Sequence, residues 1–306
     1  MSLHDPKLVR ERLVKFLRAA KESGHEIKQS HVARGIGLSP TVISAFLSDD
    51  YKGDLQGLCK RLTAYIEEQE AKARAGALVL PFVDIRQAKV GIQCFEMAQA
   101  NHSMVAVISV SGYGKTIAID QYSKLHPSTV LIKPWVTHGP SAVLQDLCEA
   151  IGENDKGLVR GLAKRIVYKL GGTDRLLIVD DAHDLGPKAL QVLRNVYDAT
   201  GIGIALCGNQ SLETKLVGTT PEMEQIARRV IYRRRLPQFV DADAKHQIGK
   251  TLPHLDAAEV LGLFHPKAKQ SPAWVGKVLY LSGKLADNDL AQVTMDHIEE
   301  ALKMVV

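Results

Sequence analysis

The chain has 306 residues, of which 45% are hydrophobic and 24% charged, and its net charge at pH 7 is +5. These values are ordinary for a globular protein, and the length is sufficient for two or three domains. No apolar run approaches the roughly 20 residues that cross a bilayer, and the four cysteines form no C-x-x-C pair, so we expect a cytoplasmic protein without membrane contact, structural zinc or disulfides. The modest positive charge favours a polyanionic partner without specifying one.

Residues 1–75 are expected to form a helical domain. The stretch IKQSHVARGIGLSPTVISAFLSDDYKGD (27–54) is typical of a helix, a tight turn at Gly37 and a second helix. The short residues Thr41 and Ser44 lie on the outward face of that second helix, which suits close approach to a DNA major groove. Contact with another protein is the alternative, because the charges of residues 1–70 nearly balance.

A linker and a connecting helix are predicted for residues 76–100, followed by a nucleotide-binding core over 101–237. In this core, SMVAVISV (103–110) is the apolar, β-branched run of a buried parallel strand, and a G-K-T turn and a helical pattern follow it. That context is typical of a phosphate-binding loop, G-x-x-x-x-G-K-[ST], although Ser109 stands where the pattern has glycine. A chance match in an α/β domain that binds no nucleotide is the alternative. The residues expected to hold the nucleotide here are Ser111, Gly112, Tyr113, Gly114, Lys115 and Thr116.

Two roles follow from this motif. Lys115 would contact the β- and γ-phosphates, and Thr116 would ligate Mg²⁺. A second apolar run, LLIV, ends in Asp180 and Asp181. Because ligands of open α/β sheets bind at the carboxyl ends of the strands, Asp180 is expected to hold the Mg²⁺ and Asp181 to orient or deprotonate the attacking water. A helix N-cap is the alternative for this acidic pair, but its position downstream of a G-K-T loop favours ATP or GTP binding.

A third apolar run, GIGIALCGN, ends in Asn209, whose amide could bond the γ-phosphate or the lytic water. Further along, Arg228 and Arg229 precede an apolar pair, and either could be supplied to a neighbouring subunit's γ-phosphate as an arginine finger. Such a finger implies a homo-oligomer, either a ring or a helical filament. A solvated or DNA-facing surface is the alternative, and we prefer it for Arg233–Arg235.

The segment KGLVRGLAKRIVYKL (156–170) is predicted to be an amphipathic helix, with Leu158 among the residues that face the core. Its other side would form a basic surface for the backbone of duplex DNA, independent of sequence, or else a plain solvated face. Secondary DNA-binding candidates lie in VLIKPWVTHGPS (130–141), where Trp135 is expected in the core. The DNA-binding candidates of these two segments are Lys156, Arg160, Lys164, Arg165, Lys133 and Thr137.

The order of the G-K-T loop, LLIVDDAH, ALCGN and the arginine pair resembles that of the AAA+ ATPases. More narrowly, residues 80–235 and the stretch GLSPTVISAFLSDDYKGD resemble the transposon target-selection ATPases, the family of the phage Mu transposition protein B and its Tn7-type relatives. This resemblance implies an α/β P-loop core with a parallel sheet, an N-terminal helix-turn-helix domain and a small C-terminal helical lid over 238–306. It also implies ATP and Mg²⁺ as cofactors and double-stranded DNA and a transposase as partners.

Two positions depart from the pattern of that family. Asp181 stands where the family usually has a catalytic glutamate, and displacing a base by about 1 Å can cost a hundredfold in rate, so we expect intact binding and slow hydrolysis. The family's lid usually carries an arginine near the nucleotide, and the segment SPAWVGKVLYL offers only Lys277.

Two functions therefore compete. The first is an ATP-dependent ATPase that binds double-stranded DNA largely without sequence specificity, oligomerises on target DNA and recruits a transposase. The second is a helix-turn-helix regulator whose P-loop core senses nucleotide with negligible hydrolysis. The arginine pair and the basic helix favour the first, and Asp181 favours the second. A helicase loader or secretion ATPase would explain the nucleotide site but not the N-terminal domain.

Overall fold

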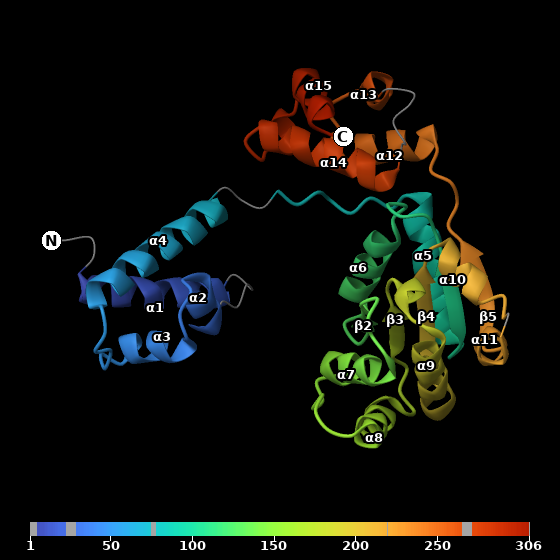
Figure 1. The fold of residues 1–306 in the computed structure, drawn as a ribbon. Helices are drawn as coiled ribbons and strands as arrows, with labels where there is room; N and C mark the ends of the chain where they lie inside the picture. The colour runs from blue at the N-terminus through green and yellow to red at the C-terminus, as the bar shows by residue number, and fades with distance from the viewer. Residues whose placement is uncertain (1–4, 23–28, 75–77, 219, 265–270, 306) are drawn as a thin grey trace. The chain divides into compact units, whose positions relative to one another are not determined.

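The computed structural model describes residues 5–22, 29–74, 78–218, 220–264 and 271–305 (Figure 1). The chain divides into two compact units, Met1–Leu78 and Val79–Val306. Within the described ranges, no helix combines the length and the apolar character needed to cross a membrane.

The first unit is helical and has its own small hydrophobic core. Leu13, Phe46 and Leu62 are fully buried in it. Helices α2 and α3 are joined by a tight turn in which Gly37 has a φ of +71°, a left-handed conformation that glycine adopts at little cost. Thr41 and Ser44 are exposed on α3. The helices of this unit are α1 (Pro6–Glu22), α2 (Gln29–Gly35), α3 (Pro40–Leu47) and α4 (Leu55–Arg74).

The second unit contains a parallel sheet whose order, among the described residues, is β2-β3-β4-β1-β5. Its strands are β1 (Met104–Ile108), β2 (Val130–Ile132), β3 (Leu176–Val179), β4 (Gly203–Gly208) and β5 (Val230–Arg235). Because all the strands run the same way, their carboxyl ends lie at one edge of the sheet, where ligands of such folds bind. Residues that follow β1, β3 and β4 therefore meet at that edge, as the sequence predicted.

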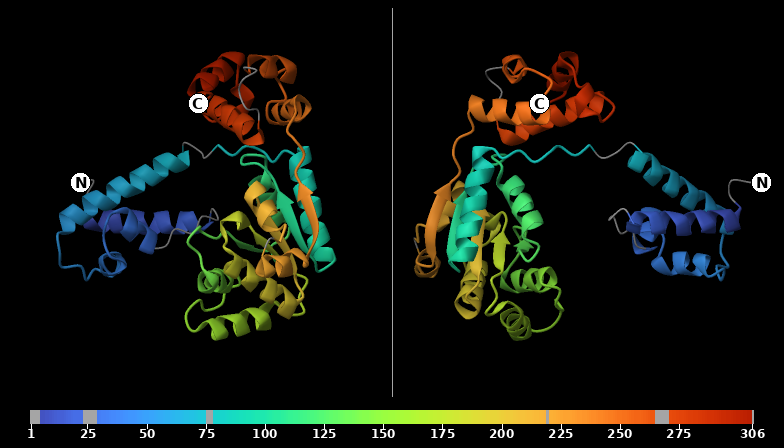
Figure 2. Two further views of the ribbon diagram at one scale, coloured as in Figure 1. Left: turned by 45° about the vertical axis from the view of Figure 1, so that its right-hand side comes forward. Right: turned by 180° about the vertical axis from the view of Figure 1, so that it is seen from behind.

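Both faces of the sheet are covered, which explains why its strands are continuous apolar runs rather than alternating ones. Met104, Ala106 and Ile108 of β1 belong to one core cluster, and Val105 and Val107 belong to the other. Helices α7 (Pro140–Ala150), α8 (Val159–Leu170) and α9 (Pro187–Thr200) pack on the first side, and α5 (Arg86–Ala100) and α6 (Lys115–Leu125) on the second (Figure 2).

The edge strand β5 was not predicted from the sequence. Val230 is buried, but the remaining five residues of the strand are exposed, so no apolar alternation marks it. Charged side chains on an edge strand also discourage pairing with another chain. The other short elements of the sheet domain are the 3₁₀ helix η1 (Ala182–Asp184), α10 (Gln210–Lys215) and α11 (Pro221–Ala227).

A C-terminal helical bundle completes the second unit, packed around residues such as Ile248, Val278 and Ile298. The bundle is joined to the sheet domain by an ion pair in which Nε and Nη2 of Arg86 each lie 2.7 Å from an oxygen of the buried carboxylate of Asp243. Its elements are α12 (Asp241–Thr251), α13 (Ala257–Leu263), α14 (Pro272–Leu285), η2 (Leu290–Gln292) and α15 (Met295–Met304).

Candidate nucleotide site

The loop between β1 and α6 has the backbone conformation that an anion site requires. Gly112 and Gly114 have φ values of +79° and +88°, in the left-handed region that other residues seldom adopt. Helix α6 begins at Lys115, so its free N–H groups and the positive end of its dipole face the loop. The carbonyl oxygen of Gly112 accepts a 3.1 Å hydrogen bond from the amide of Ala273 at the start of α14, which brings the C-terminal bundle onto the loop.

Lys115, the first residue of α6, is buried, and its side chain reaches the residue that follows β1. Its Nζ donates to both the carbonyl oxygen and the Oγ of Ser109, each at 3.4 Å. The serine that replaces the first glycine of the pattern thus adds a side-chain acceptor for the lysine, which a glycine could not supply. Thr116 lies exposed in the first turn of α6, in reach of solvent.

Two carboxylates follow β3 at the same edge of the sheet. Asp180 is only 4% exposed, and its Oδ1 accepts a 3.0 Å hydrogen bond from the amide of Asp181. Burial, and then the charge of Asp181, raise the pKa of Asp180 above its ordinary value. Asp181 has a φ of +51° and its side chain makes no capping bond to η1, so the alternative of a simple helix cap does not describe this pair.

Lys133 lies at this site, although the sequence placed it among DNA contacts. Its Nζ is 3.1 Å from Oδ2 of Asp181 and 3.7 Å from Oδ2 of Asp180. The cause is sheet order: β2 pairs with β3, with Ile132 opposite Val179, so the residues that follow the two strands are neighbours. The hydrogen bond to Asp181, together with the charges of both aspartates, raises the pKa of Lys133.

Asn209 follows β4, the strand between β3 and β1. Its side-chain oxygen accepts a 2.8 Å hydrogen bond from the amide of Ser211 and so caps α10. The oxygen is therefore engaged in the fold, and the amide N–H groups are the part that can donate to a phosphate or a water.

The donor set at this edge fits Mg²⁺ carried by a nucleotide. Among the described residues, no three His, Cys, Asp or Glu side chains are grouped so as to hold a metal ion by themselves. Asp180 and Thr116 offer one carboxylate and one hydroxyl, and Mg²⁺ is usually held by one or two carboxylates together with phosphate oxygens.

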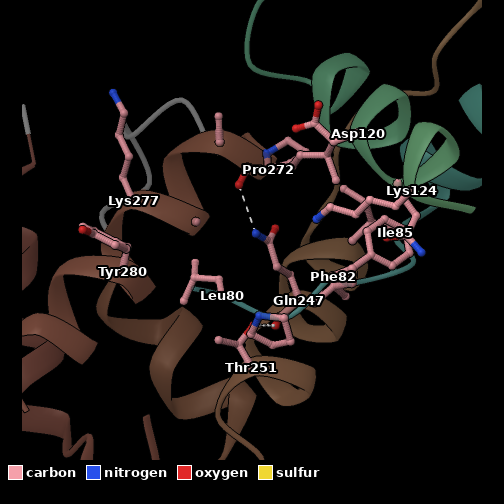
Figure 3. Close-up of a pocket in the computed structure, with 16 residues that line it drawn as sticks. Leu80, Phe82, Ile85, Asp120, Lys124, Gln247, Thr251, Pro272, Lys277 and Tyr280 are labelled. Atoms are coloured by element: carbon pink, nitrogen blue, oxygen red, sulfur yellow. Dashed lines mark hydrogen bonds between the residues drawn. The ribbon is translucent and has the colours of Figure 1, made fainter. Parts of the chain in front are cut away.

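Next to the phosphate loop lies a cavity of about 500 Å³ between the sheet domain and the C-terminal bundle (Figure 3). The segment 80–85, α6, α12 and α14 all contribute to its walls. Sequence reasoning had singled out only Lys277 here, because the other residues come from segments that are far apart in the chain and carry no motif. Its lining includes Leu80, Phe82, Ile85, Ile117, Gln121, Gln247, Thr251, Gly276, Lys277 and Tyr280.

The predicted arginine pair lies at the amino-terminal ends of the strands, opposite to the carboxyl ends where the phosphate loop lies. Arg228 is the C-cap residue after α11, just before β5, whose first residue, Val230, pairs with Met104 at the start of β1. The five residues of β1 span about 16 Å. Arg229 is bound to both carboxylate oxygens of Asp198, at 3.0 and 3.2 Å, whereas Arg228 is 73% exposed and makes one 3.6 Å ion pair with Glu224. Neither is positioned at the phosphate loop of its own chain.

Helix α8 differs from its prediction at two points. Leu158 was expected on the core face but is 84% exposed, because it lies at the N-cap position before the helix begins. Lys156 lies in the preceding loop, where its carbonyl oxygen accepts a 2.8 Å hydrogen bond from Arg165. Arg165 is half-buried and turned toward that loop rather than outward, so the exposed basic residues of the helix body include Arg160 and Lys164 but not Arg165.

The loop after β2 also departs from expectation. Trp135 was placed in the core but is 73% exposed, because the chain leaves the sheet after Ile132. Thr137 is exposed in the same loop. An apolar residue soon after a buried strand gives no sign of where the strand ends.

Comparison with known proteins places this site in a family. A family model described as an AAA domain matches residues 98–216. The chain is 31% identical over 208 residues to the Mu-like prophage FluMu DNA transposition protein B of Haemophilus influenzae, covering 67% of this chain and 72% of that protein. It is 30% identical over 224 residues to the ATP-dependent target DNA activator B of Escherichia phage Mu, covering 70% of each.

Solved structures share the fold at much lower identity. The Aeropyrum pernix ORC1 protein in complex with DNA matches with a TM-score of 0.55 and 16% identity, covering 74% of this chain and 66% of that one. Domain III of the Thermotoga maritima replication initiation protein DnaA matches with a TM-score of 0.50 and 14% identity, covering 74% and 95%. With identity near 30% to curated relatives over most of their length, and with a P-loop α/β core, the chain belongs to the Mu-type transposition protein B family of AAA+ ATPases.

Proposed function

We propose that this protein is an ATP-dependent target DNA activator for transposition: it binds ATP, assembles as an oligomer on double-stranded DNA with little sequence preference, and recruits a transposase. The observation that carries the proposal is that Lys115, Asp180 and Asp181 all lie beyond the carboxyl ends of strands of one parallel sheet, in a chain related to proteins named for ATP-dependent activation of target DNA. Lys115 would hold the β- and γ-phosphates, and the glycine-bearing loop would cradle them.

The distance between the phosphate loop and Arg228 within one chain supports the oligomer. Because Arg228 lies at the far edge of the sheet from the phosphate loop, it would act on the γ-phosphate of a neighbouring subunit. Arg229 would hold the end of α11 against α9 through Asp198, which fixes the position from which Arg228 projects. Nucleotide at such an interface would favour the assembled state, and hydrolysis would release it.

Hydrolysis would depend on Asp181 and Asn209. Asp181 would orient the attacking water, and Lys133, which pairs with its Oδ2, would compete with the water for this carboxylate. Asn209 would donate from its amide nitrogen to the γ-phosphate or the water. When bound, Mg²⁺ would neutralise charge on the phosphates, with Thr116 and Asp180 as its ligands from this chain.

Duplex DNA would be bound by the outward face of α8. Arg160 and Lys164 are exposed and lie one helical turn apart, and the sequence has no acidic residue between Lys156 and Thr173. Repeated in each subunit of an oligomer, this face would follow the phosphate backbone, so its contacts would be sensitive to salt and indifferent to sequence. Lys156 and Thr137 are further candidates in the adjoining loops, both exposed.

The N-terminal unit would be a helix-turn-helix domain. Thr41 and Ser44 present short polar side chains on α3, as contact with a major groove requires. If these residues read an operator and the core does not assemble, the protein would instead be a nucleotide-sensing regulator.

Replacing Arg160 and Lys164 together tests the DNA surface. Loss of two phosphate contacts should lower affinity for any duplex and reduce the slope of log K against log salt by about 1.8. The same measurement on Lys188→Gln is the matched control, since that variant removes an exposed lysine of α9, outside this surface, and its slope should stay at the parent value. An unchanged slope in the double variant would make α8 a solvated face.

A further inference from the structure

A lysine of α10 joins two neighbouring strand ends of the candidate site. The Nζ of Lys215 donates hydrogen bonds to the backbone carbonyl oxygens of His183 and Leu185, the second at 3.0 Å. These oxygens belong to η1 and to its C-cap residue, which directly follow Asp181. Lys215 is itself the last residue of α10, the helix whose N-cap is Asn209. One ammonium group therefore connects the turn after β3 to the helix after β4.

Hydrogen bonds of this kind can hold a backbone segment in place. A charged donor makes shorter and stronger hydrogen bonds than a neutral one, and an ammonium group can donate to two oxygens at once. The side chain of Lys215 is partly buried, which limits competition from water, and η1 packs against both α10 and β4. A lysine with its ammonium group in bulk water would constrain neither segment.

The turn that Lys215 holds carries Asp181 in an unusual backbone conformation. Asp181 has a φ of +51°, in the left-handed region that residues other than glycine seldom adopt. Its carbonyl oxygen accepts a 2.9 Å hydrogen bond from the amide of Asp184, which closes the turn. Because such a conformation costs free energy, it persists only where surrounding contacts fix it, and the bonds from Lys215 lie in the same turn. Without the ammonium group the turn could relax and carry the Asp181 carboxylate with it.

We infer that Lys215 is a positioning residue for ATP hydrolysis, which holds the turn that carries Asp181 in a fixed place relative to the helix that Asn209 begins. The inference rests on the proposed function, in which Asp181 orients the attacking water and Asn209 donates to that water or to the γ-phosphate. These two residues follow adjacent strands, since β3 pairs with β4. Two groups that act on one water need a fixed separation, because a displacement of about 1 Å can cost a hundredfold in rate. The ammonium group of Lys215 is bonded to the backbone of the turn, so it acts through Asp181 and not on the nucleotide itself.

The test is Lys215→Met, which keeps the length of the side chain and removes its donors. Single-turnover hydrolysis of ATP in the presence of duplex DNA should slow by about tenfold to a hundredfold, while the affinity for a fluorescent ADP should stay within about twofold of the parent value. Lys215→Arg retains a charged donor and should recover part of the rate. Thr214→Ala is the matched control on the same helix, because the Thr214 hydroxyl is exposed and bonds within α10, to the carbonyl oxygen of Gln210, and this variant should keep the parent rate.

A second comparison separates positioning from a general loss of structure. In an Asp181→Asn background the carboxylate that Lys215 positions is already absent, so adding Lys215→Met should slow hydrolysis further by less than about twofold. A full additional effect in that background would overturn the inference, as would a loss of ADP affinity that parallels the loss of rate.

Failure of the proposed function would give a different result. If the unmodified protein hydrolyses ATP and Lys215→Met does so at the same rate, the inference alone fails. If the unmodified protein binds no ATP, or binds it without hydrolysis, the proposed ATPase fails first and the inference fails with it.

Discussion

Lys133 offers a test of how the acidic edge is held before nucleotide binds. Its ammonium group lies 3.1 Å from Asp181 and 3.7 Å from Asp180, so it occupies the place where a cation would approach both carboxylates. Lys133→Met keeps the length of the side chain and removes its charge. We expect the site to take up Mg²⁺ with its nucleotide more readily, because no competing cation remains.

The size of this effect follows from distance and exposure. Two unit charges about 4 Å apart near a protein surface attract by about 4 kcal/mol, but the Lys133 side chain is 63% exposed and its ion pairs are screened. An exposed pair of this kind contributes about 1 kcal/mol or less, which corresponds to roughly fivefold in an equilibrium constant.

The assay is a Mg²⁺ titration of the binding of a fluorescent, non-hydrolysable ATP analogue. The Mg²⁺ concentration at half-maximal binding should fall about fivefold in Lys133→Met, and the difference should shrink at high salt because the pair is exposed. Lys188→Met removes an exposed lysine of α9 and should leave the titration unchanged. Weaker analogue binding at saturating Mg²⁺ would refute the reasoning, because Lys133 would then be a phosphate ligand and not a substitute for the cation.

Three further outcomes are expected. Asp181→Glu should raise the steady-state rate of phosphate release, since the longer side chain brings the carboxylate about 1 Å nearer the water; a fall would count against the account of slow hydrolysis. Arg228→Ala should lose turnover and recover part of it when mixed with Lys115→Ala, because one subunit then supplies the intact loop and the other the arginine; mixtures that stay inactive would remove Arg228 from the site. Arg86→Ala should lower the midpoint of unfolding of the second unit in denaturant titrations, because the buried carboxylate of Asp243 loses its bidentate partner, and adding Asp243→Asn should restore part of the loss; an unchanged midpoint in Arg86→Ala would contradict this.

The strands that carry the site could be predicted because their signals are local. Each of β1, β3 and β4 is an apolar run that is buried on both faces and is followed by polar residues or a glycine-bearing loop. Lys115, Asp180 and Asn209 accordingly lie beyond the carboxyl ends of these strands, where the pattern places them. Glycines in the loop carry equally local information, since Gly112 and Gly114 both have positive φ.

Features that depend on packing between distant segments could not be read in the same way. Lys133 contacts Asp181 only because β2 is the neighbour of β3, and the sequence of neither strand indicates their order in the sheet. Nothing in the sequence of α10 indicates that Lys215 bonds to the turn after Asp181, because that turn comes from a distant segment. The prediction that Arg165 points outward was wrong for a related reason. Helical spacing puts Arg165 beside Lys164, but its hydrogen bond to the carbonyl oxygen of Lys156 turns the side chain toward the preceding loop.

The central claim is that ATP binding controls assembly on DNA, and co-sedimentation with random-sequence duplex DNA tests it most directly. The protein should pellet cooperatively with the DNA in ATP, and not in ADP or without nucleotide, and Lys115→Ala should not pellet under any of these conditions. Pelleting that is the same in all three conditions, or that needs one particular DNA sequence, would contradict the claim and favour the regulator.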